Sequence, residues 1–174
     1  MRLGDRVAII AGGAGSMGSA VARLFAQEDA AVCVADRDEE GARETARTIV
    51  DAGGQSMSVA LDVCDAQVWD EAVNATEKTY GRLDLMVNLS GSNVRVGFEE
   101  QTEAMWRSII DVNLTSCFIG IKSVVPAMRR AGRGAILLVG SLASIRQGAG
   151  SPAYGVSKAG LVALTRSAAA AHAR

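Results

Sequence analysis

Tyr154 and Lys158 are the residues whose types and spacing most directly suggest acid–base chemistry. They are four positions apart, so on a helix both side chains lie on one face. A phenol normally has a pKa near 10, too high for proton transfer at neutral pH. A lysine charge about 4 Å away, at an effective dielectric constant near 20, favours a phenolate by roughly 4 kcal/mol. Such a pair can act as a general acid or base, although most Tyr/Lys pairs on helices are surface pairs without a function.

A glycine-rich segment, residues 12–18, joins the first predicted strand to the first predicted helix. Gly13, Gly15 and Gly18 match G-x-G-x-x-G, a pattern that lets the backbone turn tightly and approach a pyrophosphate at a helix N-terminus. Asp36 follows the next strand, 18 residues beyond Gly18. An acid about 20 residues on is positioned to bind the adenosine ribose hydroxyls. The segment therefore predicts a dinucleotide site rather than a plain tight turn.

Asp36 also bears on the choice of dinucleotide. Its carboxylate would repel a 2′-phosphate, which favours NAD over NADP. Arg37 follows directly and could pair with that phosphate, so NADP stays the alternative. A P-loop is excluded because no Gly-Lys-Ser/Thr follows the glycines.

Short apolar runs alternate with longer amphipathic stretches along the chain. The runs predict strands at residues 6–11, 31–35, 56–61, 83–89 and 135–139. The stretches predict helices at 16–27, 39–52, 65–81 and 102–131, and a last helix from Pro152 to the terminus, with Asp65 as an N-cap. Apolar strands alternating with helices are typical of a parallel sheet covered on both faces, the doubly wound α/β class. We expect residues 1–174 to form one domain.

The composition excludes several classes of function. The 174 residues are 49% hydrophobic and 21% charged, with a formal net charge of −1, as is typical of a globular domain. This balance gives no basis for binding nucleic acid or an anionic membrane. Cys33, Cys64 and Cys117 form no metal motif and predict buried, reduced thiols in a cytoplasmic protein. The lone histidine, His172, argues against a histidine-based hydrolase or a metal site, so we expect no metal.

Together these features resemble the short-chain dehydrogenase/reductase family, from about Leu3 to the end of the chain. The resemblance rests on the glycine loop, Asp36, Asp62-Val63, Asn88-Leu89-Ser90-Gly91, Asn113, Ser141 and Tyr154-x-x-x-Lys158. Ser141 lies 13 residues before Tyr154, as the family's serine does. The resemblance implies a Rossmann-type doubly wound sheet of strand order 3-2-1-4-5 with helices on both faces. It also implies an NAD(H)-dependent oxidoreductase that acts on a secondary alcohol or its ketone.

The resemblance implies catalytic roles for four residues. Tyr154 would be the general acid for carbonyl reduction and the general base for alcohol oxidation. Lys158 would make the tyrosine a stronger acid and hydrogen-bond the nicotinamide ribose. Ser141 would hydrogen-bond the substrate oxygen where negative charge develops, and Asn113 would support a water relay to the lysine. Hydride would pass between the nicotinamide and the substrate carbon.

The resemblance also implies which residues would contact the cofactor, mostly at the ends of strands. They are Gly12, Gly15, Ser16, Met17, Gly18, Asp36, Arg37, Asp62, Val63, Asn88, Ser90, Gly91, Tyr154 and Lys158. Within this set, Asp62 and Val63 would flank the adenine, and the Asn88–Gly91 turn would form the cofactor wall.

The sequence departs from the family pattern at three positions near this site. Ala11 replaces a threonine, Ser16 replaces the middle glycine, and Leu89 replaces the second asparagine of the family's Asn-Asn-Ala-Gly turn. Ser16 is compatible with the loop if its φ is negative.

The larger departure is at the carboxyl end of the sequence. Family members usually continue with two more strands and a substrate lid, which these 174 residues lack. The fifth strand would then be an apolar edge, which invites pairing with other chains. We expect a fragment or truncated product of a longer enzyme; a partner subunit covering the edge is the alternative.

Other functions and the substrate stay open at this point. A non-catalytic dinucleotide-binding module and an oligomerisation module are the alternatives to the enzyme. Helices 102–131 and 152–171 could form a subunit interface, as in the family, so we expect a homodimer or homotetramer in the full-length form. The substrate would be a small alcohol or ketone. Ile145, Arg146 and Gln147 follow Ser141 and are candidates for lining its pocket.

Overall fold

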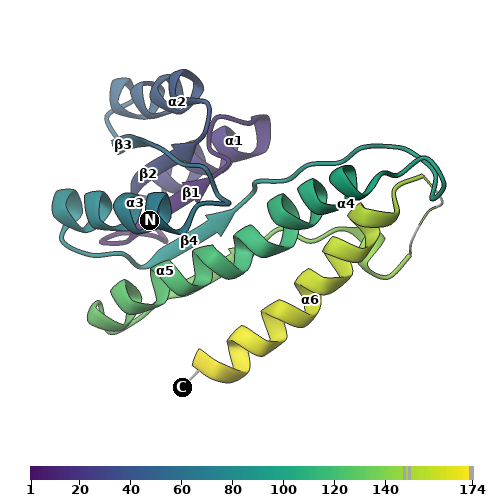
Figure 1. Cartoon of the computed structure of the whole chain (residues 1–174). Helices are drawn as coiled ribbons and strands as arrows, with labels where there is room; N and C mark the ends of the chain where they lie inside the picture. Colours follow the sequence, from purple (N-terminus) through teal and green to yellow (C-terminus); the bar gives the residue numbers. More distant parts are fainter. Residues whose placement is uncertain (147, 149, 173–174) are drawn as a thin grey trace.

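A five-stranded parallel sheet lies at the centre of the fold (Figure 1). The computed structural model describes residues 1–146, 148 and 150–172. The sheet contains β1 (Val7–Ala11), β2 (Ala31–Asp36), β3 (Gln55–Ala60), β4 (Leu85–Asn88) and β5 (Ala135–Leu138). Their order is β3-β2-β1-β4-β5, which confirms the predicted order 3-2-1-4-5.

Helices cover the sheet from both sides. They are α1 (Ser16–Gln27), α2 (Glu39–Asp51), α3 (Ala66–Tyr80), α4 (Glu103–Ile110), the π-helical turn η1 (Asp111–Thr115), α5 (Ser116–Arg130), the 3₁₀ turn η2 (Leu142–Ser144) and α6 (Pro152–His172). One core cluster joins α1 and α2 to the sheet through residues such as Ile10, Ala22 and Ile49. The other, with Trp69 and Val124, joins α3 and α5 to the opposite face.

Local signals in the sequence explain where several helices begin and end. The Asp65 carboxylate accepts from the amides of Gln67 and Val68 and caps α3, as predicted. The same helix stops at Gly81, whose φ of 79° is in the left-handed region that favours glycine. Pro152 is the first residue of α6, where its missing N–H costs nothing.

Residues Glu103–Arg130 form one 28-residue helical stretch made of α4, η1 and α5. Its most apolar window has a mean hydropathy of 1.4, so by length and composition alone it passes the test for a membrane span. Its buried positions include Ile121, Val124 and Met128, which pack in the core beneath the sheet. A core helix of a soluble protein passes the same test, so the stretch is weak evidence for a membrane.

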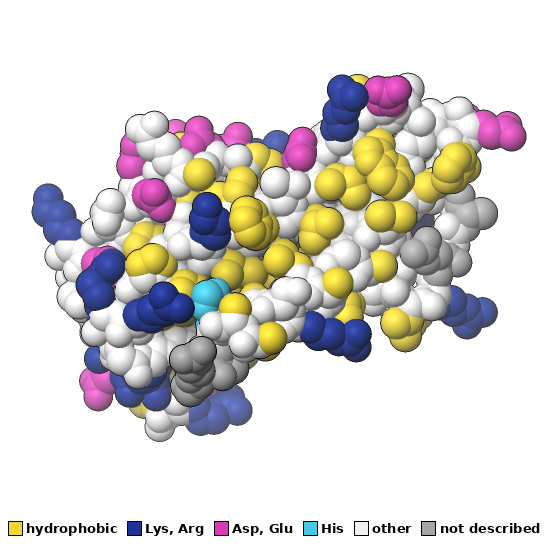
Figure 2. All heavy atoms as spheres, turned by 60° about the horizontal axis from the view of Figure 1, so that its bottom comes forward, with side chains coloured by type: hydrophobic (Ala, Val, Ile, Leu, Met, Phe, Trp, Pro, Cys, Tyr) yellow, Lys and Arg dark blue, Asp and Glu magenta, His cyan; other side chains and the backbone are white. Residues whose placement is uncertain are grey.

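Like β3 at the other edge of the sheet, the edge strand β5 is covered less than the three central strands. Its side chains are only partly covered, and Leu137 is 53% exposed. Helices lie on both sides of the sheet, as predicted, but in the part of the chain that the structure describes they leave Leu137 on this edge strand half-exposed. On the opposite face a groove of about 680 Å³ runs between α5, β5 and α6, with Ile136 and Leu138 in its lining. Figure 2 shows hydrophobic side chains along this face, with basic side chains around them.

The three cysteines divide into two classes. Cys33 and Cys117 are buried, as predicted, whereas Cys64 is exposed. The prediction was wrong for Cys64 because this residue lies in the turn between β3 and α3, and turns run over the surface.

Candidate active site

The register of the sheet brings the predicted site residues to one edge. Ala11 pairs with Ala35 on one side and with Asn88 on the other, and Asn88 pairs with Leu138. In a parallel sheet these paired positions end together, so the segments that follow them meet at the carboxyl edge. The residues next along the chain are Gly12, Asp36, Leu89 and Val139.

The glycine loop makes a tight cradle between β1 and α1. Gly12 has a φ of 81°, and a Cβ on Gly18 would lie 1.9 Å from the Gly12 carbonyl oxygen. Gly15 is the N-cap of α1 and has no side chain to cap it, so the first-turn amides of Ser16 and Met17 are available to a ligand. Ser16 has a helical, negative φ, as its place in this loop requires.

Asp36 lies beside this cradle at the end of β2. One oxygen, Oδ2, accepts a 3.0 Å hydrogen bond from the Ala14 amide, and Oδ1 accepts one from the Asp38 amide. Two backbone donors therefore hold the carboxylate in place. Arg37 is exposed next to it.

The opposite wall of the cradle is the turn after β4. A Cβ on Gly12 would lie 2.9 Å from the Ser90 amide nitrogen, so the backbone of this turn packs directly against the glycine loop. The Asn88 carboxamide oxygen accepts a hydrogen bond of 3.0 Å from the same Ser90 amide. Gly91, the next residue, lies within 3.5 Å of the Asn113 carboxamide oxygen, measured from the position of an added Cβ.

Asp62 and Val63 lie after β3, the far strand of this half of the sheet. The Asp62 carboxylate accepts from the Cys64 amide at 2.9 Å, and the Val63 carbonyl accepts from the Trp69 indole at 3.0 Å. Asp36 pairs with Ala60 in the ladder, so this turn lies on the Asp36 side of the cradle.

The Tyr154–Lys158 pair lies on α6, as its spacing predicts. The Lys158 ammonium donates to the Val139 carbonyl at 2.7 Å and lies 5.8 Å from the centroid of the Tyr154 ring. Lys158 is only 5% exposed. The lysine is therefore fixed between its tyrosine and the end of β5.

Ser141 forms its own turn. Its hydroxyl accepts a 3.1 Å hydrogen bond from the Ala143 amide and caps η2, which packs against α6. Within residues 1–146, 148 and 150–172, no hydrogen bond joins Ser141 to Tyr154. The structure thus places Ser141 on the segment next to α6, with no hydrogen bond to Tyr154 or Lys158 among the described residues. Ile145 and Arg146 are exposed nearby, whereas Gln147 lies outside the described residues.

Asn113 lies in the π turn and is fully buried. Its carboxamide donates to the Ser92 carbonyl at 2.8 Å and accepts from the Ser92 amide at 2.7 Å. It also donates to the Ser157 hydroxyl at 3.1 Å, and that hydroxyl donates to the Tyr154 carbonyl. The side chain of Asn113 therefore connects the turn after β4 to the helix that carries the tyrosine.

Sequence reasoning missed Ser92, Ser157 and Cys117. Ser157 lies inside the Tyr-x-x-x-Lys motif, and Cys117 lies four residues after Asn113. These positions relative to the motif and to Asn113 are the only sequence signals for Ser157 and Cys117, and Ser92 has none. Among the described residues no group of three or more His, Cys, Asp or Glu side chains could hold a metal ion.

Comparison with known proteins gives consistent matches along almost the whole chain. A family model for short chain dehydrogenases matches residues 6–174. The chain is 36% identical over 168 residues to 2,5-dichloro-2,5-cyclohexadiene-1,4-diol dehydrogenase LinX of Sphingobium indicum, covering 97% of this chain and 67% of the relative. It is 36% identical over 174 residues to trans-4-hydroxycyclohexanecarboxylate dehydrogenase of Sinomonas cyclohexanicum, with the same coverage.

A solved structure agrees with these matches. The crystal structure of gox2181 superposes with a TM-score of 0.94 at 32% identity, covering 99% of this chain and 68% of that one. The chain therefore spans about two thirds of the relatives that it matches. With the fold, the order of the strands and the matched family model in agreement, the chain belongs to the short-chain dehydrogenase family.

Proposed function

We propose that the protein is an NAD(H)-dependent oxidoreductase that interconverts a secondary alcohol and its ketone. The observation that carries this proposal is the buried Lys158 ammonium, held at the end of β5 beside the Tyr154 ring. Two relatives are named as dehydrogenases of ring alcohols, and a third, at 31% identity, is named cyclopentanol dehydrogenase. We extend the proposal to a cyclic alcohol as substrate.

The residues at the carboxyl edge fit a dinucleotide. A pyrophosphate would fit against the amides of Ser16 and Met17 at the start of α1. The loop is so tight here that a Cβ on Gly18 would clash with the Gly12 carbonyl oxygen. A nicotinamide supplies hydride transfer when it is bound. The cradle, the Asp36 carboxylate and the turn at Ser90 would hold the three parts of such a ligand.

Asp36 supports NAD as the preferred cofactor. Two backbone amides orient its carboxylate beside the cradle, where it can accept from the ribose hydroxyls. The same negative charge would repel a 2′-phosphate. Arg37 is exposed and could offset that repulsion, so NADP stays the second candidate.

Tyr154 would donate a proton to the ketone oxygen or remove one from the alcohol. Lys158 would hold its positive charge beside the Tyr154 ring from its place at the end of β5. Ser141 would donate to the substrate oxygen through its own O–H, since its oxygen accepts from the Ala143 amide and keeps that hydrogen for a further bond. Asn113 would hold the tyrosine helix in place through Ser157.

Two measurements test the proposal. In a fluorescence titration of the 174-residue chain, we expect saturable binding of NADH and weaker binding of NADPH. We then expect oxidation of cyclohexanol with NAD⁺, lost in Tyr154→Phe while NADH binding stays. Tighter NADPH binding would contradict the role of Asp36, and full turnover by Tyr154→Phe would contradict the role of the tyrosine.

A non-catalytic dinucleotide-binding module is the second candidate. It is favoured by Ser141, whose hydroxyl caps its own turn at Ala143 and makes no hydrogen bond to Tyr154 among the described residues. It predicts NADH binding without turnover in either wild type or Tyr154→Phe. The same comparison therefore separates the two functions.

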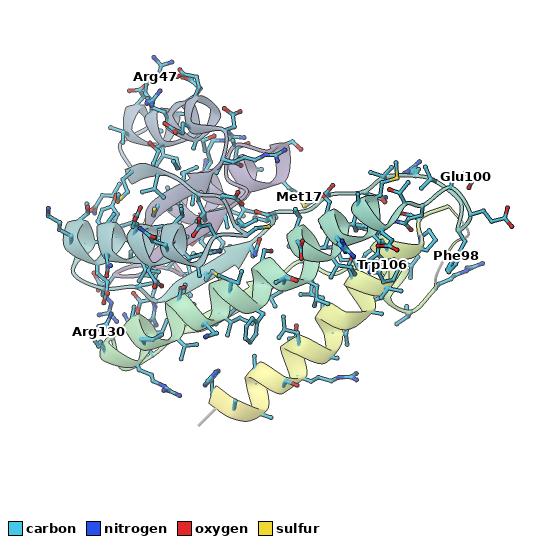
Figure 3. The ribbon with its side chains drawn as sticks, in the orientation of Figure 1. Met17, Arg47, Phe98, Glu100, Trp106 and Arg130 are labelled. Atoms are coloured by element: carbon cyan, nitrogen blue, oxygen red, sulfur yellow. The ribbon has the colours of Figure 1, made fainter. Side chains whose placement is uncertain are left out.

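We further propose a cytoplasmic protein that forms a homodimer or homotetramer in its full-length form and binds neither nucleic acid nor membrane. The near-neutral net charge of −1 supports the last two points. The α5 surface carries an exposed apolar side chain, Phe118, which is 50% exposed with the Lys122 ammonium over its ring. Figure 3 shows Phe98, also exposed, at the far end of the segment between β4 and α4. Light scattering of the full-length form tests the oligomeric state.

A further inference from the structure

A buried thiol lies behind the wall of the proposed nucleotide cleft. Cys117 on α5 is 3% exposed, and its sulfur accepts a hydrogen bond from the Asn88 carboxamide nitrogen at 3.5 Å. The same thiol donates to the Asn113 backbone carbonyl, also at 3.5 Å. Asn88 and Asn113 are likewise buried, so both of these polar groups depend on protein partners.

The thiol completes a two-point attachment between the β4 turn and the π turn. Asn88 and Ser92 lie four residues apart on the β4 side, and Asn113 and Cys117 lie four residues apart on the helix side. Asn88 is joined to Cys117, and Ser92 is joined to Asn113 by two hydrogen bonds. The segment between them, which contains Ser90, is therefore held at both ends.

This segment is the wall that packs on the glycine loop. The carboxamide of Asn88 has two tasks, since its nitrogen donates to Cys117 and its oxygen accepts from the Ser90 amide. The Ser90 amide nitrogen lies only 2.9 Å from the position of a Cβ on Gly12. A rotation of the Asn88 carboxamide would consequently move the backbone that faces the cradle.

We propose that Cys117 is a positioning residue for the nucleotide cleft: its thiol orients Asn88 and so fixes the turn at Ser90 against the glycine loop. The inference rests on the proposed nucleotide binding and goes beyond it by giving a function to a core residue that touches no ligand. A valine here fills similar volume but leaves the Asn88 nitrogen without an acceptor, which is costly in a buried site. A serine keeps both the donor and the acceptor.

The test compares Cys117→Val, Cys117→Ser and a matched control, Cys33→Val, in the 174-residue chain. Cys33 is equally buried but lies within β2 in the core. We expect Cys117→Val to raise the NADH dissociation constant by about tenfold, whereas Cys117→Ser restores binding and Cys33→Val leaves it unchanged. In the wild type, the infrared S–H stretch of Cys117 is the band that disappears in both Cys117 variants. We expect this band at the lower frequency of a thiol that is hydrogen-bonded to a carbonyl.

Hydrogen exchange of the Ser90 and Ser92 amides decides the inference independently of nucleotide. Faster exchange of these amides in Cys117→Val than in wild type or Cys33→Val supports the attachment. Absence of NADH binding by the wild type would overturn only the proposed function. Unchanged NADH affinity with unchanged exchange in Cys117→Val would overturn the positioning role. An S–H band at the frequency of an unbonded thiol would overturn it as well.

Discussion

The Lys158 ammonium donates a 2.7 Å hydrogen bond to the carbonyl oxygen of Val139. Val139 directly follows β5, and its own amide donates to the Asn88 carbonyl at 3.3 Å. A cation on α6 is thus anchored to the end of the sheet at which β4 and β5 stop. Because that anchor is a backbone carbonyl, it does not depend on the identity of the Val139 side chain.

Removing the Lys158 charge is expected to reduce turnover strongly. Lys158→Met keeps the length of the side chain and removes its charge, so we expect turnover of cyclohexanol to fall by about 100-fold or more. Lys122→Met is the control, since Lys122 is exposed on α5. Steady-state kinetics check the prediction, and equal turnover of the Lys158→Met variant and wild type would contradict it.

Asp36→Ser is expected to change the preference between the two dinucleotides. The shorter neutral side chain no longer repels a 2′-phosphate, so we expect NADH affinity to fall by about tenfold and NADPH affinity to rise. Asp38→Ala serves as the control because Asp38 caps α2 through the Gly41 amide. That variant should cost about 1 kcal/mol of stability without altering the ratio of the two affinities in a fluorescence titration.

Gly18→Ala is expected to disrupt the cradle. The added Cβ would lie 1.9 Å from the Gly12 carbonyl oxygen, so the loop must move at a cost of about 1–3 kcal/mol in the free energy of unfolding. Gly4→Ala meets no atom within 4 Å and should change that free energy by less than about 0.5 kcal/mol. Urea denaturation measures both, and a wild-type NADH affinity in Gly18→Ala would refute the cradle.

Asp84 should be the most sensitive charge in the fold. Its carboxylate is 1% exposed and accepts from Arg82 and Arg133, each Nε at 2.8 Å. Asp84→Asn keeps the shape but removes the charge that these guanidinium groups pair with; because the arginine side chains are 33% and 42% exposed, we expect a loss of about 1–3 kcal/mol. Glu77→Gln breaks the more exposed pair with Arg130 and should cost clearly less, because solvent screens that pair. Similar urea midpoints for the two variants would count against a special role for Asp84.

Cys33 makes the fold sensitive to alkaline pH. Burial raises the pKa of the Cys33 thiol from 9.0 to about 11. Below about pH 9 the thiol is protonated in both the folded and the unfolded chain, and its contribution to stability is fully present. As the pH rises toward 11, the unfolded chain loses this proton first. The free energy of unfolding therefore falls, by about 2–3 kcal/mol at most. Cys33→Val has no such proton. Urea denaturation at several pH values should show a shallower alkaline decline for the variant, and parallel declines would disprove the assignment.

Local patterns in the sequence were sufficient for most of the architecture. The alternation of strands and helices, the cap at Asp65 and the start of α6 at Pro152 were predicted from local residues and are confirmed. The order of the five strands, which the family resemblance implied, is confirmed as well. Apolar periodicity, capping side chains and glycine stops act within a few residues of the positions that they control. The family also follows from the sequence, because its motifs stand in order along one chain.

Only the tertiary structure decided which side chains meet. Asn113 reaches Ser92 and Ser157, and Cys117 reaches Asn88, through hydrogen bonds that span 21 to 44 residues. These contacts depend on where α5 and α6 cross the end of the sheet, which no local pattern encodes. The same holds for the exposure of Leu137 on β5, because whether a face is covered depends on the elements packed against it and not on its own residues.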